Sequence, residues 1–256
     1  MQIITSPSKT QQFNGREYRE YSLPRLQMKT KHLIDLLKKM SREDLADLLK
    51  TGEKLAHSTY RRIQGCTTKV TLQNASQALF TYQGDAYSAI AADRYTDEEL
   101  RHAQKHLFIL SALHGILRPL DLIQPYRLEI TTPLAITGAE NLYHFWRDAV
   151  TQILNTSLLE HEDRTLVNLA SAEYAKMIDK QEFQGTMVTI SFKEKLQGKY
   201  RTIPLHAKKA RGLMVHYVIS NRISEPLRLR DFCEDGYVFC AAESTEKEWL
   251  FGREGE

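Results

Sequence analysis

The sequence has 256 residues, of which 42% are hydrophobic and 26% are charged, and its mean hydropathy is −0.44. These values are typical of a globular protein and exclude a collagen-like repeat, a long coiled coil and a disordered chain. The three cysteines, Cys66, Cys233 and Cys240, are widely spaced, which argues against a disulfide framework and favours a reducing compartment. No secretion leader is visible, and the most apolar stretch, 107–117, is too short to cross a bilayer. We therefore expect a cytoplasmic protein with no membrane partner.

The first half of the sequence contains one clear strand signal and several helix signals. Residues 2–5 are expected to form a strand that runs into a Ser-Pro-Ser turn, and two amphipathic helices are expected at 27–39 and 42–54. A serine N-cap followed by acidic residues begins the second of these helices. Thr96 starts a capping box that opens another helix, whereas residues 106–113 fit either a buried strand or the end of that helix.

The second half is expected to contain further helices and strands. Its expected elements are a helix at 141–158, a buried strand at 165–169 followed by a helix, a strand at 187–192 paired with 199–203, and a terminal hairpin formed by 237–240 and 248–251. No period of 20–50 residues repeats, and no stretch rich in Pro, Gly or Ser separates two halves. The sequence therefore predicts a single domain over residues 1–256.

The helix that follows His206 has the clearest pattern. Its apolar residues form one stripe, made of Ala210, Leu213, Met214, Tyr217 and Val218. On the opposite side, Lys208, Arg211 and Arg222 lie within about 60° of one another, with Lys209 on the flank. The cations are either the solvated face of a surface helix or a row that meets phosphates, and the pattern alone does not decide between the two.

Charge is unevenly distributed along the chain. The formal net charge is +3 overall, but it is +7 over 1–69, −6 over 70–175, +8 over 176–230 and −6 over 231–256. The two basic blocks can meet in the fold as one positive surface that attracts a polyanion. The alternative is that their charges are spread over solvated faces.

Three polar segments stand at expected turns. Residues 6–10, which include Lys9, follow a strand, at the end where α/β folds place ligands, although the glycines of a phosphate loop are missing. Asp85, next to a glycine, is either a helix cap or a site carboxylate. Residues 168–176 join a strand to a helix and carry Glu173 and Lys176, and such a helix N-terminus can hold an anion.

The densest polar segment is 113–129, where two prolines prevent regular structure. It carries two arginines and two carboxylates between apolar anchors, namely Arg118, Arg127, Asp121 and Glu129. These groups form either a structural ion network or a site for a planar oxyanion. His102 and His106 have the spacing of a metal chelate, but no metalloprotease pattern accompanies them, so we expect no metal and no cofactor.

Several of these segments resemble the successive blocks of the YaaA family of bacterial peroxide stress resistance proteins. The blocks are SPSKT at 6–10, QGDAY at 83–87, GILRPLDLIQPYRLE at 115–129, NLYHFW at 141–146, VNLASAEYAK at 167–176, HAKKARGLM at 206–214 and GYVF at 236–239. The resemblance implies an α+β (mixed α/β) fold: one compact domain with a central mixed sheet, surrounding helices and a positively charged cleft. It also implies a cytoplasmic protein that binds duplex or distorted DNA and limits iron-mediated damage during peroxide stress.

The resemblance further implies a helix-hairpin-helix element, which grips a phosphate through backbone N–H groups. We place it at 110–117, where Leu117 stands in the position of the second glycine, or at the helix pair 27–39 and 42–54. The leading phosphate-binding candidates match the family's AKKAR block, with further cations from other segments: Lys208, Lys209, Arg211, Arg118, Arg127 and Lys9.

Three hypotheses follow. The first is a DNA-binding protein, with a monomer favoured. The second is an enzyme that acts on a base, a nucleotide or a small anion, for which the candidate catalytic residues are Asp85, Asp121, Glu173 and Lys176, with Arg118, Arg127, Glu129 and Asn168 nearby. The third is direct iron sequestration by the acidic block at 70–175. The residues do not decide whether any reaction is catalysed or whether a cysteine senses oxidant.

Overall fold

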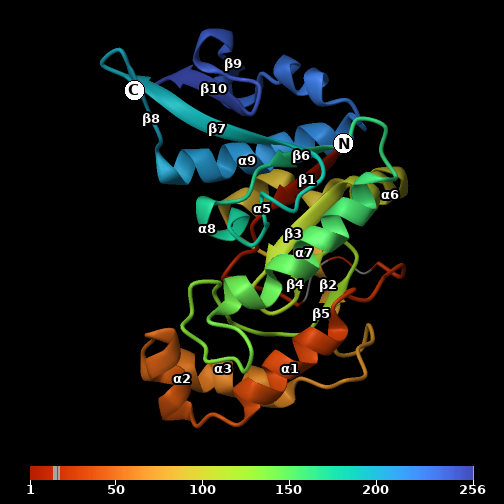
Figure 1. Ribbon diagram of the computed structural model, residues 1–256, viewed down its shortest axis with the longest axis vertical. Helices are drawn as coiled ribbons and strands as arrows, with labels where there is room; N and C mark the ends of the chain where they lie inside the picture. The colour runs from red at the N-terminus through yellow and green to blue at the C-terminus, as the bar shows by residue number, and fades with distance from the viewer. Residues whose placement is uncertain (14–15, 17, 256) are drawn as a thin grey trace.

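An eight-stranded mixed sheet forms the centre of the molecule (Figure 1), and the computed structural model describes residues 1–13, 16 and 18–255 of the chain. The strands follow the order β4-β3-β1-β6-β7-β10-β9, with β8 paired to β7. Their bounds are β1 Gln2–Thr5, β3 Leu107–Ser111, β4 Gly115–Leu117, β6 Thr165–Asn168, β7 Thr186–Leu196, β8 Lys199–Arg201, β9 Val238–Phe239 and β10 Glu248–Glu254. A separate two-stranded sheet pairs β2, Ser76–Gln77, with β5, Leu122–Ile123. The result is a single mixed α/β domain.

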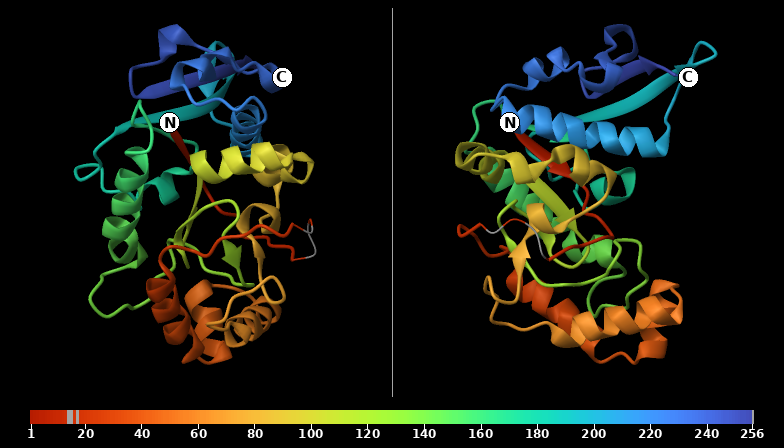
Figure 2. Two further views of the ribbon diagram at one scale, coloured as in Figure 1. Left: turned by 90° about the vertical axis from the view of Figure 1, so that its right-hand side faces the viewer. Right: turned by 180° about the vertical axis from the view of Figure 1, so that it is seen from behind.

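The helices surround this sheet. They are α1 Gln27–Lys38, α2 Arg42–Leu49, α3 Glu53–Gly65, α4 Ala78–Thr81, α5 Asp85–Ile90, α6 Asp97–His106, α7 Leu142–Leu158, α8 Ala172–Ala175 and α9 Pro204–Ser220, with short 3-10 turns η1 Ala92–Arg94, η2 Pro226–Asp231, η3 Glu234–Gly236 and η4 Ala241–Glu243. Helices α1, α2 and α3 gather at one end of the molecule, and β7, β9 and β10 lie at the other (Figures 1 and 2). No helix in the described part of the chain is both long and apolar enough to span a membrane.

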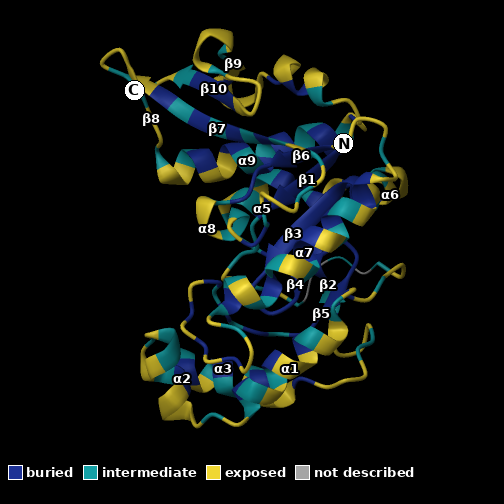
Figure 3. Cartoon of the chain, in the orientation of Figure 1, coloured by how far each residue is buried: buried dark blue, intermediate teal, exposed yellow. Residues whose placement is uncertain are grey.

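Strand β1 lies in the interior of the sheet, with a parallel neighbour on each side. Strand β1 pairs in parallel with β3 on one side and with β6 on the other, so that Ile3 lies beside both Leu107 and Val167. All four residues of β1 are buried, and the surrounding strands form the dark interior of Figure 3. Because the chain moves to opposite sides of β1 for β3 and β6, the loops after β1 and β6 leave a crevice between them, which is where open α/β sheets bind ligands.

Most of the expected elements are confirmed, with shifted ends. Ser41 and Thr96 each complete a capping box, which begins α2 and α6. The helix expected at 42–54 is too long, because Lys50 adopts a left-handed backbone and ends α2 at Leu49. A further helix, α3, begins at Glu53. The ambiguous segment after α6 is strand β3, which is buried throughout. The terminal hairpin is also confirmed, as β9 pairs antiparallel with β10.

The placement of a helix-hairpin-helix at 110–117 is wrong. Strands β3 and β4 form an antiparallel hairpin there, with Ser111 opposite Gly115. Gly115 has a φ of +72°, and a Cβ on it would lie 2.6 Å from the ring of Trp146. Gly115, which was expected to belong to a phosphate-binding hairpin, therefore allows a tight β-turn against a buried tryptophan.

Candidate functional site

A cleft of about 580 Å³ opens at the carboxyl ends of β1 and β6. Five segments form its walls: the loop after β1, the start of α5, residues 126–130, the start of α8 and the first turns of α9. Its charged side chains are Lys9, Asp85, Arg127, Glu129, Glu173, Lys208 and Arg211. The cleft thus collects cations from both basic blocks of the sequence, and three carboxylates with them.

Short hydrogen bonds fix the loops that follow β1 and β6. The Ser6 Oγ accepts a hydrogen bond of 2.8 Å from the Ser171 backbone N–H, which ties the two loops together. Tyr87 donates its hydroxyl to the Ser6 carbonyl at 2.9 Å. Ser171 also caps α8, because its hydroxyl accepts a hydrogen bond from the Tyr174 N–H. The floor of the cleft is therefore rigid backbone, in contrast to a free loop.

Gly84 lies where α5 meets α9. Its φ is +105°, a value that favours glycine, and a Cβ there would lie 3.5 Å from the Ser8 hydroxyl and 3.9 Å from the Lys208 ammonium. The Lys208 Nζ stands 3.7 Å from an Asp85 carboxylate oxygen. The backbone turn at Gly84 thus brings a hydroxyl, a cation and a carboxylate to one wall of the cleft.

A second ion cluster lies on the facing wall. The Lys9 ammonium is 2.6 Å from one oxygen of Glu129, and Arg127 approaches the other oxygen at 3.4 Å. The Lys9 side chain is 65% exposed, so its ion pair is weak and is readily exchanged for another anion. Glu129 therefore occupies the place on these two cations that an external anion would take.

Arg211 differs from the other cations of the cleft. It makes no ion pair with any carboxylate of the described residues, and its Nε is buried without a hydrogen-bond partner. Burial lowers the pKa of Arg211, although a guanidinium remains charged at any physiological pH. A desolvated cation with unused donors is the strongest feature of the cleft for binding an anion such as phosphate.

Three tyrosines line the cleft together with aliphatic side chains such as Leu128 and Ile130, and the sequence pattern gave the tyrosines no role. Tyr87, Tyr126 and Tyr174 stand in three of the motif blocks, next to Asp85, Arg127 and Glu173. Burial raises the pKa of each of these hydroxyls, so all three are neutral. The recurrence of a tyrosine beside a charged residue in each block is the signal that could have identified this wall.

Lys209 of the AKKAR block and Arg222, which was expected on the same helix face, lie away from the cleft. Lys209 points from α9 toward Asp235, with 3.4 Å between Nζ and Oδ2. Arg222 lies beyond the end of α9, with a left-handed backbone, and pairs with Glu98 at 2.8 Å. The expected row of three cations that includes Arg222 is therefore wrong, because the helix ends at Ser220.

Arg118 and Asp121 form a buried structural pair. The Asp121 carboxylate accepts hydrogen bonds from the Arg118 backbone N–H at 2.8 Å, the Arg118 guanidinium at 2.9 Å and the Ser22 hydroxyl at 2.6 Å. Asp121 is fully buried, and this burial raises its pKa. Neither residue lines the cleft, so the structural alternative for this part of the 113–129 segment holds, whereas Arg127 and Glu129 belong to the cleft.

Lys176 and Asn168 are also outside the lining. Asn168 accepts from the Ala170 N–H at 3.0 Å and so shapes the loop after β6.

His102 and His106 stack with ring centroids 4.1 Å apart, and among the residues with described positions no group of three or more His, Cys, Asp or Glu side chains is arranged to hold a metal ion. All three cysteines are free thiols, and burial raises the pKa of Cys66.

The fold and the cleft together define a single-domain mixed α/β protein with a charged cleft at the switch point of its sheet. The family model described as peroxide stress protein YaaA matches residues 1–243, and the chain belongs to this family. A UPF0246 protein of Acaryochloris marina is 47% identical over 253 residues, covering 99% of this chain and 100% of the relative. UPF0246 proteins of Shewanella woodyi and Shewanella sediminis are 42% and 40% identical over 255 residues, each with at least 99% of both chains covered.

Proposed function

We propose that this protein acts in the peroxide stress response by binding DNA through the cleft, as a monomer in the cytoplasm, and that DNA held there is shielded from iron-mediated oxidation. The observation that carries the proposal is Arg211, a half-buried guanidinium with unused donors. Lys208 supports it from the same helix, and Lys9 and Arg127 do so from the facing wall. These cations come from segments far apart in sequence, as a surface that receives a phosphate backbone requires.

The contribution of phosphate contacts sets the salt dependence. If the four cations of the cleft each neutralise one phosphate, the logarithm of the affinity falls with the logarithm of the salt concentration with a slope of about −3.6. The binding is expected to show little sequence preference, because Lys and Arg contacts to phosphate carry no base information.

The experiment compares a pair of cations in the cleft with a pair of cations outside it. Replacing Lys208 and Arg211 by alanine is expected to weaken binding of a 20-base-pair duplex at least tenfold and to reduce the salt slope by about 2. The matched control is Arg222→Ala with Arg228→Ala, which removes the same formal charge at exposed positions beyond the end of α9 and outside the cleft. Fluorescence anisotropy over a range of salt concentrations measures both.

Two results would contradict binding of DNA in the cleft. If the control pair weakens binding as much as the cleft pair, the effect is one of overall charge and the cleft is not the interface. If the intact protein binds duplex and bubble-containing DNA with no salt dependence, phosphate contacts do not drive the binding, and the proposal fails.

The second candidate function is an enzyme that acts on a nucleotide or another small anion. The observation in its favour is the set of carboxylates inside a concave cleft, where Asp85 and Glu173 face the same space as Arg211. Carboxylates are not needed for passive phosphate binding, but they serve general acid–base chemistry. Borohydride trapping of abasic DNA on Lys9 or Lys208 tests the lyase version of this function, since it fixes a Schiff base as a covalent adduct.

A helix-hairpin-helix contact is a separate proposal. The helix pair expected at 27–39 and 42–54 is α1 and α2. The next turn along the chain joins α2 to α3 through the three residues Lys50, Thr51 and Gly52, at the end of the molecule formed by the first three helices. The N–H groups of Lys50 and Thr51 donate to carbonyls of α2, so we propose that the Gly52 N–H and the exposed Lys50 ammonium meet a second phosphate segment of bound DNA. Footprinting with the Lys50→Glu variant tests this, because the added repulsion shortens the protected stretch only if the turn touches DNA.

A further inference from the structure

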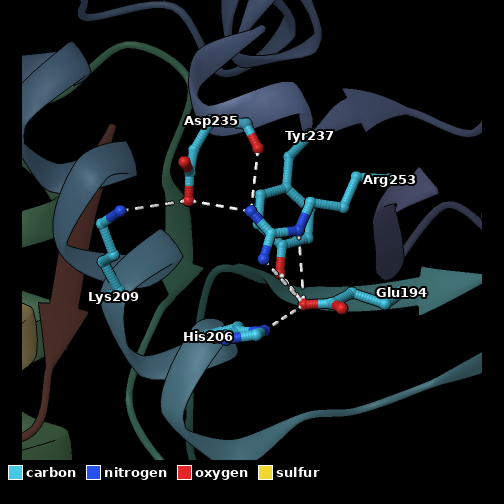
Figure 4. Close-up of polar contacts among 6 residues, drawn as sticks. All are labelled: Glu194, His206, Lys209, Asp235, Tyr237 and Arg253. Carbon is cyan, nitrogen blue, oxygen red and sulfur yellow. Dashed lines mark hydrogen bonds and ion pairs between the residues drawn. The ribbon is translucent and has the colours of Figure 1, made fainter. Parts of the chain in front are cut away.

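A polar network outside the cleft holds the other face of α9. Figure 4 shows its six residues, from β7, α9, η3 and β10: Glu194, His206, Lys209, Asp235, Tyr237 and Arg253. We call these the Glu194 network. A carboxylate that is 5% exposed stands at its centre, and no residue of the network lines the cleft.

Glu194 receives several donors on one oxygen. Its Oε1 accepts hydrogen bonds from His206 Nδ1, from Arg253 Nη2 at 2.9 Å and from the Tyr237 hydroxyl at 3.3 Å. Burial alone would raise the pKa of Glu194, but the hydrogen bonds from His206 and Arg253 outweigh it and lower the pKa. Glu194 is therefore a fixed negative charge that attaches the first turn of α9 to the sheet.

The outer part of the network continues from Arg253 to α9. The Arg253 Nη1 donates to the Asp235 carboxylate at 2.9 Å, and Lys209 lies 3.4 Å from the same oxygen. Asp235 has a φ of +54°, which is costly for a residue other than glycine. Two cations on its carboxylate stabilise this backbone and hold η3 against α9.

Helical geometry places the network and the cleft on two faces of one helix. Lys208 and Arg211 are three residues apart, hence about 60° apart around the axis, and so are His206 and Lys209. The two pairs lie about 140–160° from each other. The first pair faces the cleft, and the second faces Glu194 and Asp235. A rotation or displacement of the first turns of α9 therefore moves both pairs together.

We propose that Glu194 is a positioning residue for the cleft: through His206 it fixes the rotation of α9 and thereby the place of the Lys208 and Arg211 cations. The inference rests on the proposed function, because it assigns a purpose to the position of those cations. The same role applies in the free protein, where Glu194, on the opposite side of α9, holds the buried Arg211 Nε–H in position.

The first measurement uses the free protein. Hydrogen exchange at Arg211 Nε–H, followed by NMR, is expected to be at least about fivefold faster in Glu194→Gln and in His206→Ala, because the helix face that buries it is no longer fixed. Lys9→Ala, in the cleft but not on α9, is the matched control and leaves this exchange unchanged. Exchange that is equal in all four proteins overturns the inference, whatever happens with DNA.

The second measurement is a double-mutant cycle on duplex binding. Glu194→Gln is expected to weaken binding about fivefold in the otherwise unchanged chain, and by less than about twofold when Lys208 and Arg211 are already alanine. In the Lys9→Ala background the full fivefold effect remains. Equal effects in all three backgrounds show general destabilisation and overturn the inference. If the intact protein does not bind DNA, the proposed function fails while the exchange measurement still decides the role of Glu194. His206→Ala serves the same cycle should Glu194→Gln not fold.

Discussion

At the scale of single residues, the cations of the cleft are already partly neutralised. Asp85 stands 3.7 Å from Lys208, and Glu129 contacts both Lys9 and Arg127. A bound phosphate must displace these carboxylates or accept their repulsion. The two carboxylates therefore lower the affinity for a polyanion and confine the strongest attraction to Arg211.

Replacing the two carboxylates by amides distinguishes DNA binding from catalysis in the cleft. Asp85→Asn with Glu129→Gln is expected to tighten duplex binding about tenfold, because two repulsive charges disappear and three cations, Lys9, Arg127 and Lys208, gain access to phosphate. The measurement is anisotropy at fixed salt, with Glu98→Gln, which frees Arg222 outside the cleft, as the control. Weaker binding by the double variant, together with loss of a turnover, would instead support a catalytic role for the carboxylates.

At the scale of elements, the crossing of α5 and α9 sets the width of the cleft. Gly212 of α9 lies against α5, where an added Cβ would collide with the Ala86 carbonyl and lie 2.9 Å from the Ala89 Cβ. The absence of a side chain lets the two helices approach closely enough for Asp85 and Lys208 to form one wall. The glycine of the AKKARG block is therefore explained by helix packing, and not by flexibility.

Gly212→Ala is expected to lower the free energy of unfolding by about 1–3 kcal/mol, since overpacking forces backbone shifts. It should also weaken duplex binding, because the same shift separates the two walls. Urea denaturation measures the first effect and anisotropy the second. The matched control is Gly65→Ala in the last turn of α3, where a Cβ meets nothing within 4 Å. A stable Gly212→Ala protein would show that α5 and α9 are not in close contact.

The same scale shows what the sequence could and could not predict. Local signals were sufficient for α6, which has a complete capping box, and for the apolar strand β6. They failed at residue 50, where a left-handed lysine ends a helix whose apolar pattern continues. They also failed for the hairpin of β3 and β4, because the choice between helix and strand there depends on pairing with β1, which is distant in sequence.

The candidate site was only partly predictable for a related reason. The polar loops after β1 and β6 were identified, since strand ends are visible in the sequence. Which charged residues reach the cleft depends on tertiary burial: Arg127 lines it, whereas Arg118, nine residues earlier, pairs with Asp121 in the interior. The distance between the two arginines in sequence gives no indication of this difference.

At the scale of the whole molecule, buried neutral histidines make stability dependent on pH. Burial lowers the pKa of His102 and His161 to about 4 and that of His114 to about 3, from a usual value of 6.5. The unfolded chain therefore takes up these protons at a higher pH than the folded one. The stabilisation is complete above pH 6.5 and declines as the pH falls from 6.5 toward 4.

We expect the free energy of unfolding to fall between pH 7 and pH 5, by about 2 kcal/mol from fully buried His114 alone. Urea denaturation at several pH values measures the decline. His102→Gln should flatten part of it, and the exposed His57→Gln should leave it unchanged. Stability that is constant over this range would contradict the burial of these three rings.

The central place of β1 also has a kinetic consequence. Its four residues pair with β3 and β6, which follow about 100 and about 160 positions later. Neither sheet neighbour exists while the chain is being made up to residue 106, so β1, whose four residues are all buried in the folded protein, remains unpaired through much of translation. We therefore expect β1 to complete its pairing late in folding, and residues 2–5 to stay accessible to a chaperone until then.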